Sequence, residues 1–297
     1  MSAFLHLFSK TFLFLLLVCG VAVLPQTVAA EEVIITNPVK SSDDKRFDYP
    51  MALLRAAMER TVDHYGPFRI ERYPTGMSRK RALQQLMSGN PNVFEAPTRL
   101  EWEASAIPIR IPIRKGLLGY RLLLIRDVDQ DIFSGVNSID DLKKYRMGGG
   151  AQWSTTMAVR RLGFTVYGGA EYEPLFSMLM GKRFDYFPRG VNEVFAEFDT
   201  RKAKFPTMRI EKTVALYLPL PTYFFVTPKR PDLAKRLTQG LLSMVDDGSL
   251  DKMFEAYHGP SIERANLKNR RIIELKNLNL TDETPFHRKD FWIDPKK

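Results

Sequence analysis

The first third of the chain alternates between apolar and polar residues in a way that predicts strands separated by helices. Residues 33–36 and 93–96 are short apolar runs, and residues 68–73 alternate, so each is expected to be a strand. Between them, apolar residues recur with the period of a helix that buries one face. The two stripes are Met51, Leu54, Met58 and Val62, and then Ala82, Leu83, Leu86 and Met87. This order predicts an α/β layer.

The mixed pattern continues to about residue 260. Isoleucines occupy alternate positions over residues 107–113, and Pro108 and Pro112 lie between them. Because proline cannot donate a ladder hydrogen bond, this stretch is expected to be an edge strand or an extended crossing. Pro188 is expected to end the strand before it. The other expected strands are 122–125, 184–187, 208–210 and 222–227, and the other expected helices are 139–144, 172–180, 191–198, 231–246 and 250–257.

A glycine run precedes one of these helices. Gly148, Gly149 and Gly150 are followed by Ser154 and Thr155. Glycines allow a sharp turn and a close approach to a ligand, and either hydroxyl could cap the helix. A helix N-terminus favours an anion. The run lacks the further glycine of a dinucleotide site and the Gly-Lys-Ser/Thr of a P-loop, so a nucleotide is not expected.

Residues 1–30 have the pattern of a secretory signal peptide. Lys10 precedes an apolar run over residues 11–24, and the segment ends at Ala30 with the small residues of a cleavage site. An uncleaved anchor and a lipoprotein modified at Cys19 are the alternatives. Because Cys19 is the only cysteine, the mature chain would have no thiol. We therefore expect a soluble exported protein of the periplasm.

The charge is positive but dispersed. The chain has 44 Lys and Arg against 34 Asp and Glu, and removal of Lys10 with the signal peptide leaves 43 against 34, a net charge of +9. Such a charge suits nucleic acid, an acidic surface or anionic ligands. The basic residues are scattered and no nucleic-acid-binding motif is present, so no nucleic-acid partner is expected.

Four segments resemble the family 3 extracellular solute-binding proteins, the substrate-binding components of ABC transporters. Residues 138–148 are similar to the family's entry into its second lobe, and Ser154 and Thr155 are similar to the hydroxyl pair that meets the ligand carboxylate. Residues 180–187 resemble a strand entry of the family, and residues 227–259 resemble its terminal helix pair. The resemblance implies the α/β fold of type II periplasmic binding proteins, with two lobes, two hinge crossings and a ligand cleft between the lobes.

The resemblance also implies domain bounds. Lobe one is expected to comprise residues 31–122 plus 220–297, and lobe two residues 123–219. The hinge crossings are expected near 120–125 and 216–223. The basic tail, residues 262–297, lies outside the resemblance and is expected either to wrap lobe one or to contact a partner.

The family implies a ligand-binding arginine just after the third strand, and here Arg99 stands in that place. A guanidinium offers two parallel donors to a carboxylate. The family's ammonium-binding aspartate has no counterpart, because Arg189 occupies the region and Glu193 is the next carboxylate. Arg189 would repel an ammonium and attract an anion, which favours an anionic solute. A salt bridge at the surface or between the lobes is the alternative for Arg189.

Aromatic side chains line such clefts and enclose the body of the ligand. Trp153 is the leading candidate because it adjoins the hydroxyl pair, and Trp102 and Tyr49 are further candidates. Tyr120 and Tyr223 lie near the expected crossings, where packing at the hinge accounts for them equally well.

The sequence therefore predicts a monomeric periplasmic solute-binding protein that captures a small anionic or amino-acid-like solute by hinge closure. The expected partner is the membrane permease of an ABC importer. No cofactor or metal is expected, because His64, His258 and His287 are isolated and lack metal-ligand spacing. An envelope signalling protein that reads the closed lobes is the alternative partner.

An enzyme is not expected. The alternative is a protein that resembles the cyclohexadienyl dehydratases, which are built on the same fold with carboxylates in the cleft. Glu95, Glu101, Glu103 and Glu193 could be recruited for such chemistry, but no pattern among them requires it.

Overall fold

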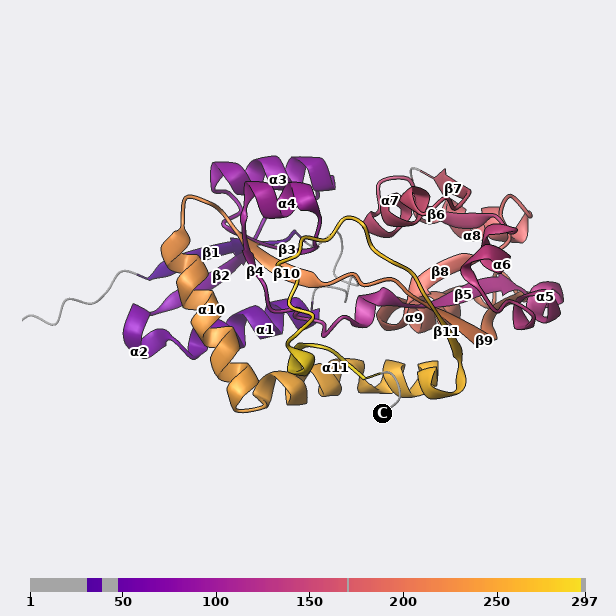
Figure 1. Ribbon diagram of the computed structural model, residues 1–297. Coiled ribbons are helices and arrows are strands. Elements are labelled where there is room, and N and C mark those ends of the chain that lie inside the picture. Colours follow the sequence, from indigo (N-terminus) through magenta and orange to yellow (C-terminus); the bar gives the residue numbers. More distant parts are fainter. Residues whose placement is uncertain (1–30, 39–47, 170, 295–297) are drawn as a thin grey trace, which may run out of the picture.

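A computed structural model describes residues 31–38, 48–169 and 171–294, and Figure 1 shows two α/β lobes joined side by side. The expected signal peptide, residues 1–30, lies outside the described residues. Within the described part, no helix has both the length and the apolar character needed to cross a membrane.

The sheet of lobe one is assembled from strands at both ends of the chain. β1 (Glu32–Thr36) pairs in parallel with β2 (Phe68–Arg72). β10 (Thr222–Val226) lies between β3 (Val93–Pro97) and β4 (Ile107–Ile109), antiparallel to both. The prediction of an edge strand among the alternating isoleucines is confirmed, because β4 is the edge of this sheet.

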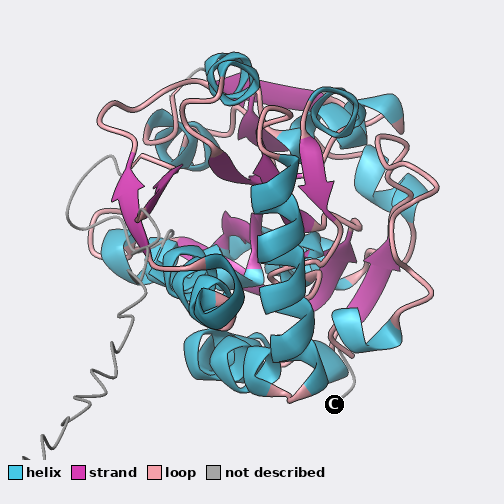
Figure 2. Ribbon diagram, turned by 90° about the vertical axis from the view of Figure 1, so that its left-hand side faces the viewer, coloured by secondary structure: helices cyan, strands magenta, loops and turns pink. Residues whose placement is uncertain are grey.

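Two asparagines join β1 to β3. The Asn92 side chain accepts from the amide of Ile35 and donates to the carbonyl of Val33. The Asn37 side chain likewise accepts from the backbone N–H of Glu95 and donates to its carbonyl. The helices of this lobe cover the sheet, as the view from the lobe-one end in Figure 2 shows. They are α1 (Asp48–Glu59), α2 (Val62–Tyr65), α3 (Arg79–Ser88), α4 (Leu100–Ser105), α10 (Pro231–Asp246) and α11 (Ser249–Ala265).

The sheet of lobe two has the order β11-β9-β5-β8, and β6 and β7 adjoin its β8 end through a bridge between Met147 and Tyr186. Its strands are β5 (Tyr120–Arg126), β6 (Met147–Gly150), β7 (Val166–Gly169), β8 (Phe187–Gly190), β9 (Met208–Tyr217) and β11 (Arg271–Glu274). Its helices are α5 (Gln130–Ser134), α6 (Ile139–Lys143), α7 (Ser154–Arg161), α8 (Pro174–Met180) and α9 (Val191–Arg201). Short 3₁₀ turns occur at Leu117–Gly119, Asp127–Asp129, Leu267–Asn269 and Lys289–Phe291.

The strand β8 corrects the sequence prediction. Pro188, Arg189 and Gly190 were expected to end a strand over 184–187, but they lie within β8, which pairs with β5. As a result, Arg189 is a buried strand residue.

The glycine run also serves a different purpose from the expected one. Gly148, Gly149 and Gly150 form the buried strand β6, and none of them has a positive φ. A Cβ at these positions would collide with the side chains of Phe184, Thr156 and Trp153, in that order. These glycines therefore make room for neighbouring side chains, and the expected sharp turn is wrong.

The two expected crossings between the lobes are present. The chain enters lobe two through β5 and leaves it between β9 and β10, and the backbone N–H of Leu218 donates to the carbonyl of Gly119 between them. The rings of Tyr120 and Tyr217 stack there with centroids 4.4 Å apart. This pairing places both tyrosines in the packing of the hinge.

The sequence-based bounds assigned the whole tail to lobe one, but the structure shows that the chain after α10 also contacts lobe two. Helix α11 starts against α1 and α10 in lobe one, and its far end packs on α9 in lobe two, where Arg264 pairs with Asp199 at 2.6 Å. β11 then pairs in parallel with β9. The chain after α10 thus crosses to lobe two before it returns to lobe one.

Candidate ligand-binding cleft

A cavity of about 680 Å³ lies between the lobes, a size in the range of small-molecule sites. Its wall is contributed by α3, β3 and the start of α4 from lobe one, and by α7, β8 and α9 from lobe two. Five arginines and three glutamates line it, a net charge of +2. They are Arg79, Arg99, Arg114, Arg121, Arg189, Glu95, Glu171 and Glu193.

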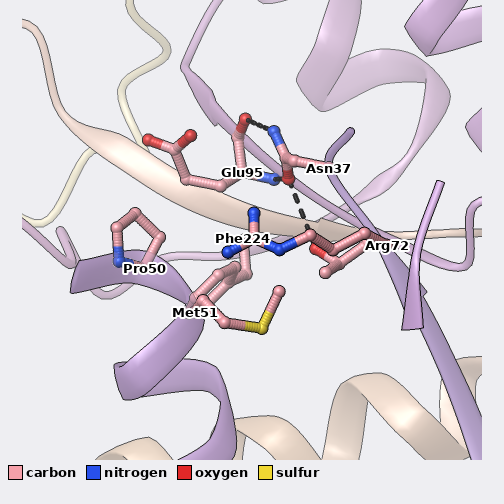
Figure 3. A pocket seen from close by; sticks show the side chains of 7 residues that line it. Asn37, Pro50, Met51, Arg72, Glu95 and Phe224 are labelled. Atoms are coloured by element: carbon pink, nitrogen blue, oxygen red, sulfur yellow. Dashed lines mark hydrogen bonds between the residues drawn. The ribbon is translucent and has the colours of Figure 1, made fainter. Parts of the chain in front are cut away.

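A second hollow adjoins the cleft in lobe one, and Figure 3 shows the side chains around it. Asn37 and Glu95 line both spaces, and Arg72 and Met51 line only the smaller one. Because its volume is about 10 Å³, it has room for no more than a water-sized group. The larger cleft is therefore the candidate site for a solute.

Arg99 reaches across the cleft. It immediately precedes α4 in an extended conformation (φ −152°). Its Nε donates to Ser154 Oγ at 2.8 Å and its Nη2 to the carbonyl of Gln152 at 3.1 Å, both in lobe two. Burial lowers the pKa of Arg99. Among the described residues, no carboxylate lies within ion-pair distance of Arg99. Its hydrogen-bond partners are neutral dipoles, and the charge of Glu101 acts on it from a greater distance.

Ser154 and Thr155 open α7 and line the cleft opposite Arg99. The cap position belongs to Trp153, and no side chain caps this helix, so the expected hydroxyl cap is not present. Ser154 Oγ instead accepts from Arg99. The first turn of α7 adds a partial positive charge to the side of the cleft that faces the Arg99 guanidinium.

Arg189 lies against two acids. Its Nε and Nη2 donate to the two carboxylate oxygens of Glu197 at 2.7 and 2.5 Å, and Glu193 lies 3.1 Å from Nη2. Burial by itself lowers the pKa of Arg189, but the charges of Glu193 and Glu197 outweigh it and raise the pKa. The expectation that Arg189 repels an ammonium and attracts an anion is therefore wrong. Arg189 is in salt bridges, as the alternative proposed, but they are buried and lie within lobe two, where α9 supplies the acids.

Trp153 is the aromatic candidate that the structure brings to the cleft. The Arg189 guanidinium lies 4.6 Å from its ring centroid, and Phe187 stacks with it at 6.0 Å. Gly150 permits this position, since any Cβ there would overlap the indole. Trp153 thus forms a wall that Arg189 supports from one side.

Trp102 and Tyr49 do not line the cleft. Trp102 is 2% exposed and packs between Phe94 and Phe225 in the core of lobe one. Tyr49 is also 2% exposed, and its hydroxyl donates to the carbonyl of Ile113 at 2.6 Å. Both candidates are corrected to core residues, because an aromatic in an amphipathic pattern fills a core as readily as it lines a site.

Sequence reasoning missed several residues of the cleft. Arg121 in β5 is 3% exposed, and burial lowers its pKa to about 10. Its Nε and the Oδ1 of Asn192 in α9 are buried and have no hydrogen-bond partner within the described residues. The strand and helix periods could have indicated that both positions face inward, but the shared cleft depends on the packing of the two lobes.

In the wall of the cleft, Arg114 lies between Glu95 and His258. Arg114 Nε is 3.6 Å from Glu95 Oε1, and Arg114 Nη1 is 3.5 Å from His258 Nε2. Burial, followed by the charge of Arg114, lowers the pKa of His258 to about 3. The imidazole is therefore neutral at pH 7. In the part of the chain that the structure describes, no cluster of His, Cys, Asp and Glu could hold a metal ion.

The two lobes, the two-strand hinge and the cleft define the fold of type II periplasmic binding proteins. The chain is similar to an ancestral arginine-binding protein bound to arginine, at a TM-score of 0.55 and 17% identity, over 77% of this chain and 99% of that one. It is also similar to a probable amino-acid ABC transporter extracellular-binding protein of Bacillus subtilis, at a TM-score of 0.55 and 14% identity, over 77% and 98%. An arginine-specific periplasmic binding protein of Salmonella typhimurium matches at a TM-score of 0.54 and 12% identity, over 76% and 99%. No protein-family model and no curated protein sequence matches the chain.

These likenesses show the fold. They span nearly the whole of each solved structure but about three quarters of this chain. The chain therefore contains segments that these structures do not match.

Proposed function

We propose that the protein is a solute-binding protein that holds a small carboxylate-bearing solute, anionic or amino-acid-like, between its lobes. The observation that carries the proposal is Arg99, a partly buried guanidinium with neutral partners that joins the two walls of the cleft. A carboxylate would supply the ion-pair partner that Arg99 does not have among the described residues, and the N-terminus of α7 would stabilise it from the other side. The lining of the cleft stays positive when Glu197, the partner of Arg189, is counted with the lining acids, and this supports the same solute class.

The proposed setting is the periplasm, after export directed by residues 1–30. Solved structures with this fold include amino-acid-binding proteins and an ABC transporter component, which supports delivery of the solute to the permease of an ABC importer. An envelope sensor that reads the closed state is the alternative partner, since both roles use closure around a solute. No residue of the cleft is assigned a catalytic role.

The test of this function is a thermal-shift screen of amino acids and dicarboxylates, followed by calorimetric titration of any compound that raises the melting temperature. For such a compound, Arg99→Ala should weaken binding about 10- to 100-fold, because a hydrogen bond to a charged group contributes about 1.5–3 kcal/mol. Arg81→Ala is the matched control, because Arg81 is exposed on α3 and does not line the cleft. Equal affinity in the Arg99→Ala variant and the wild type would overturn the assignment, as would stabilisation by cationic compounds alone.

A further inference from the structure

After α11, the chain follows a course along both lobes. We call residues 271–293 the strap. It begins as β11 on the sheet of lobe two and ends against lobe one, and Figure 1 shows it in yellow along one side of the molecule. Each of its ends is anchored to a different lobe.

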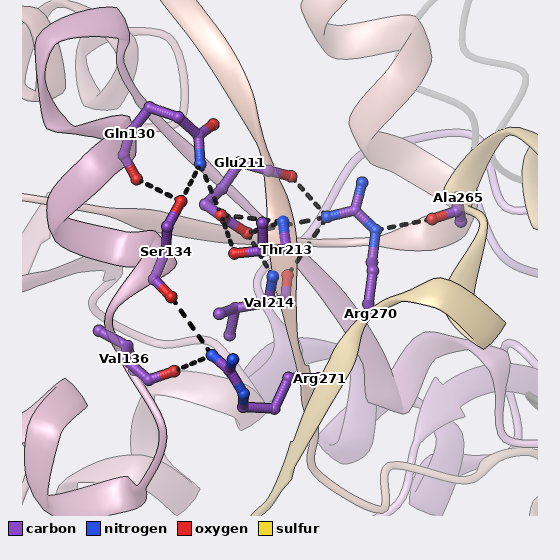
Figure 4. Close-up of polar contacts among 9 residues, drawn as sticks. All are labelled: Gln130, Ser134, Val136, Glu211, Thr213, Val214, Ala265, Arg270 and Arg271. Carbon is purple, nitrogen blue, oxygen red and sulfur yellow. Dashed lines mark hydrogen bonds and ion pairs between the residues drawn. The ribbon is translucent and has the colours of Figure 1, made fainter.

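The lobe-two end is anchored by buried polar contacts, which Figure 4 shows. Just before the strap, Arg270 donates through Nη1 to the carbonyl of Glu211 at 2.5 Å and through Nε to the carbonyl of Ala265 at 2.7 Å. The carboxylate of Glu211 accepts in turn from the backbone N–H groups of Thr213 and Val214. This network fixes the start of the strap to β9.

The lobe-one end is anchored by packing. The indole of Trp292 lies against Gly116, where no Cβ could fit. The backbone N–H of Ile293 donates to the carbonyl of Lys115 at 2.9 Å, and Phe291 is 6% exposed. These residues hold the strap beside the loop that leads into the first hinge crossing.

Between its ends, the strap connects α7, which carries Ser154 and Thr155, with α4, which begins immediately after Arg99. On α7, Arg161 donates through Nη1 to the Leu278 carbonyl at 3.2 Å and to Asn279 Oδ1 at 2.5 Å. On α4, Glu103 Oε2 accepts from Thr281 Oγ1 at 2.9 Å. Helix α4 follows Arg99 and α7 starts at Ser154, so the strap bridges the same two elements that face each other across the cleft.

The contact between Thr281 of the strap and Glu103 of lobe one is reinforced by Arg110. Arg110 pairs with Glu103 at 3.0 Å and also pairs with Glu283 of the strap. The other oxygen of Glu103 accepts from Thr98 Oγ1 at 2.5 Å, next to Arg99. The Glu103 side chain is 3% exposed, whereas Arg161 is exposed. The contact with Arg161 is therefore the weaker of the two.

We propose that the strap limits how far the two lobes open, and that its contact with Arg161 is the point at which it releases. This inference depends on the hinge motion of the proposed function. Asn279 and Thr281 are two residues apart, and two residues of extended chain span about 7 Å. Helices α4 and α7 cannot separate by much more than the slack in this connection unless one contact breaks. The exposed Arg161 contact breaks first, because water replaces it at little cost.

The test is the distance between the lobes in solution, measured by pulsed electron paramagnetic resonance without any added solute. Spin labels are placed at Gln84→Cys on α3 and at Arg183→Cys in lobe two, both exposed, in a chain with Cys19→Ser. The otherwise unaltered chain should show one narrow distance distribution. Arg161→Ala should add a population at longer distance, and the further change Thr281→Val should enlarge it.

Arg288→Ala is the matched control. Arg288 pairs with Asp290 inside the strap at 2.7 Å and holds neither lobe to the other, so the distribution should stay narrow. Asn279→Ala removes the side-chain part of the same contact and leaves the Leu278 carbonyl, so its effect should be smaller than that of Arg161→Ala, and far-UV circular dichroism verifies the fold of each variant. A distribution that stays unchanged in the Arg161→Ala, Thr281→Val double variant would overturn the proposal. Because no solute is present, the failure of every compound to bind would refute the proposed function and leave this result standing.

Discussion

At the scale of single residues, the cleft contains arginines whose surroundings give them different roles. Arg189 is paired with two carboxylates, so it has little net charge to offer a solute and instead supports the wall formed by Trp153. Among the described residues, Arg99 has hydrogen bonds to a hydroxyl and a carbonyl of lobe two and no ion pair. Of these two guanidinium groups, the partly buried Arg99 therefore has the stronger attraction for an anion. Residue type alone did not distinguish them, because the partners of Arg189 are four and eight positions away on a helix.

A pH prediction belongs to the same scale. The folded-state pKa of His258 is about 3, below its ordinary value, so the unfolded chain takes up the proton first as the pH falls. The neutral imidazole thus makes its full contribution to the free energy of unfolding above pH 6.5, and this contribution declines as the pH falls towards 3. Between pH 6.5 and 4.5 the loss should reach about 1–3 kcal/mol. Urea unfolding of His258→Gln should show a flatter acid limb than the wild type, whereas a variant of the exposed His64 should keep the wild-type slope. Parallel curves for His258→Gln and the wild type would contradict the prediction.

At the scale of elements, local periodicity accounts for most of what the sequence predicted correctly. The order of strands and helices, the edge strand β4 and the long helix α10 follow from patterns within a few residues. The prediction placed strand β8 about three residues too early, because Pro188 was expected to end it. Pro188 lies within β8, and proline is tolerated there because β8 is at the edge of its four-stranded sheet. The glycines of β6 were misinterpreted because side-chain crowding, unlike a turn, leaves no local signal.

The crowding at β6 can be tested directly. Gly148→Ala should destabilise the protein by about 1–3 kcal/mol, because its Cβ would overlap the ring of Phe184. In a Phe184→Leu background the same change should cost less, and the difference, read from a double-mutant cycle of urea unfolding, measures the contact. Gly135→Ala is the control, because the nearest atom to the added Cβ would be the carbonyl oxygen of Ile132 at 3.5 Å, an ordinary van der Waals contact. An equal cost of Gly148→Ala in both backgrounds would show that the ring is not the reason for the glycine.

At the scale of the whole molecule, the chain crosses between the lobes more often than the sequence indicated. The resemblance predicted the two hinge strands, but β11 pairs with a strand 57 positions earlier, since Arg271 aligns with Val214. A four-residue strand in a polar tail carries no pattern that identifies such a distant partner. The sequence likewise predicted only some of the residues that line the cleft. Arg99 and Ser154 were found from motifs, whereas Arg121 and Asn192 became visible only once both lobes were in place.

The tail should therefore contribute to stability as well as to hinge motion. Leu275 is 3% exposed and packs with the core of lobe two, whereas Leu278 in the same segment is 38% exposed. Leu275→Ala should lower the free energy of unfolding by about 2–5 kcal/mol, and Leu278→Ala should change it by less than about 0.5 kcal/mol. Truncation after Ala265 should cost more and should promote association, because it uncovers the edge of β9. Urea unfolding and size-exclusion chromatography measure the two effects. If the truncated chain stayed monomeric with unchanged stability, the tail would have no part in holding the lobes together, and the limit on opening would have to come from the hinge strands and α11 alone.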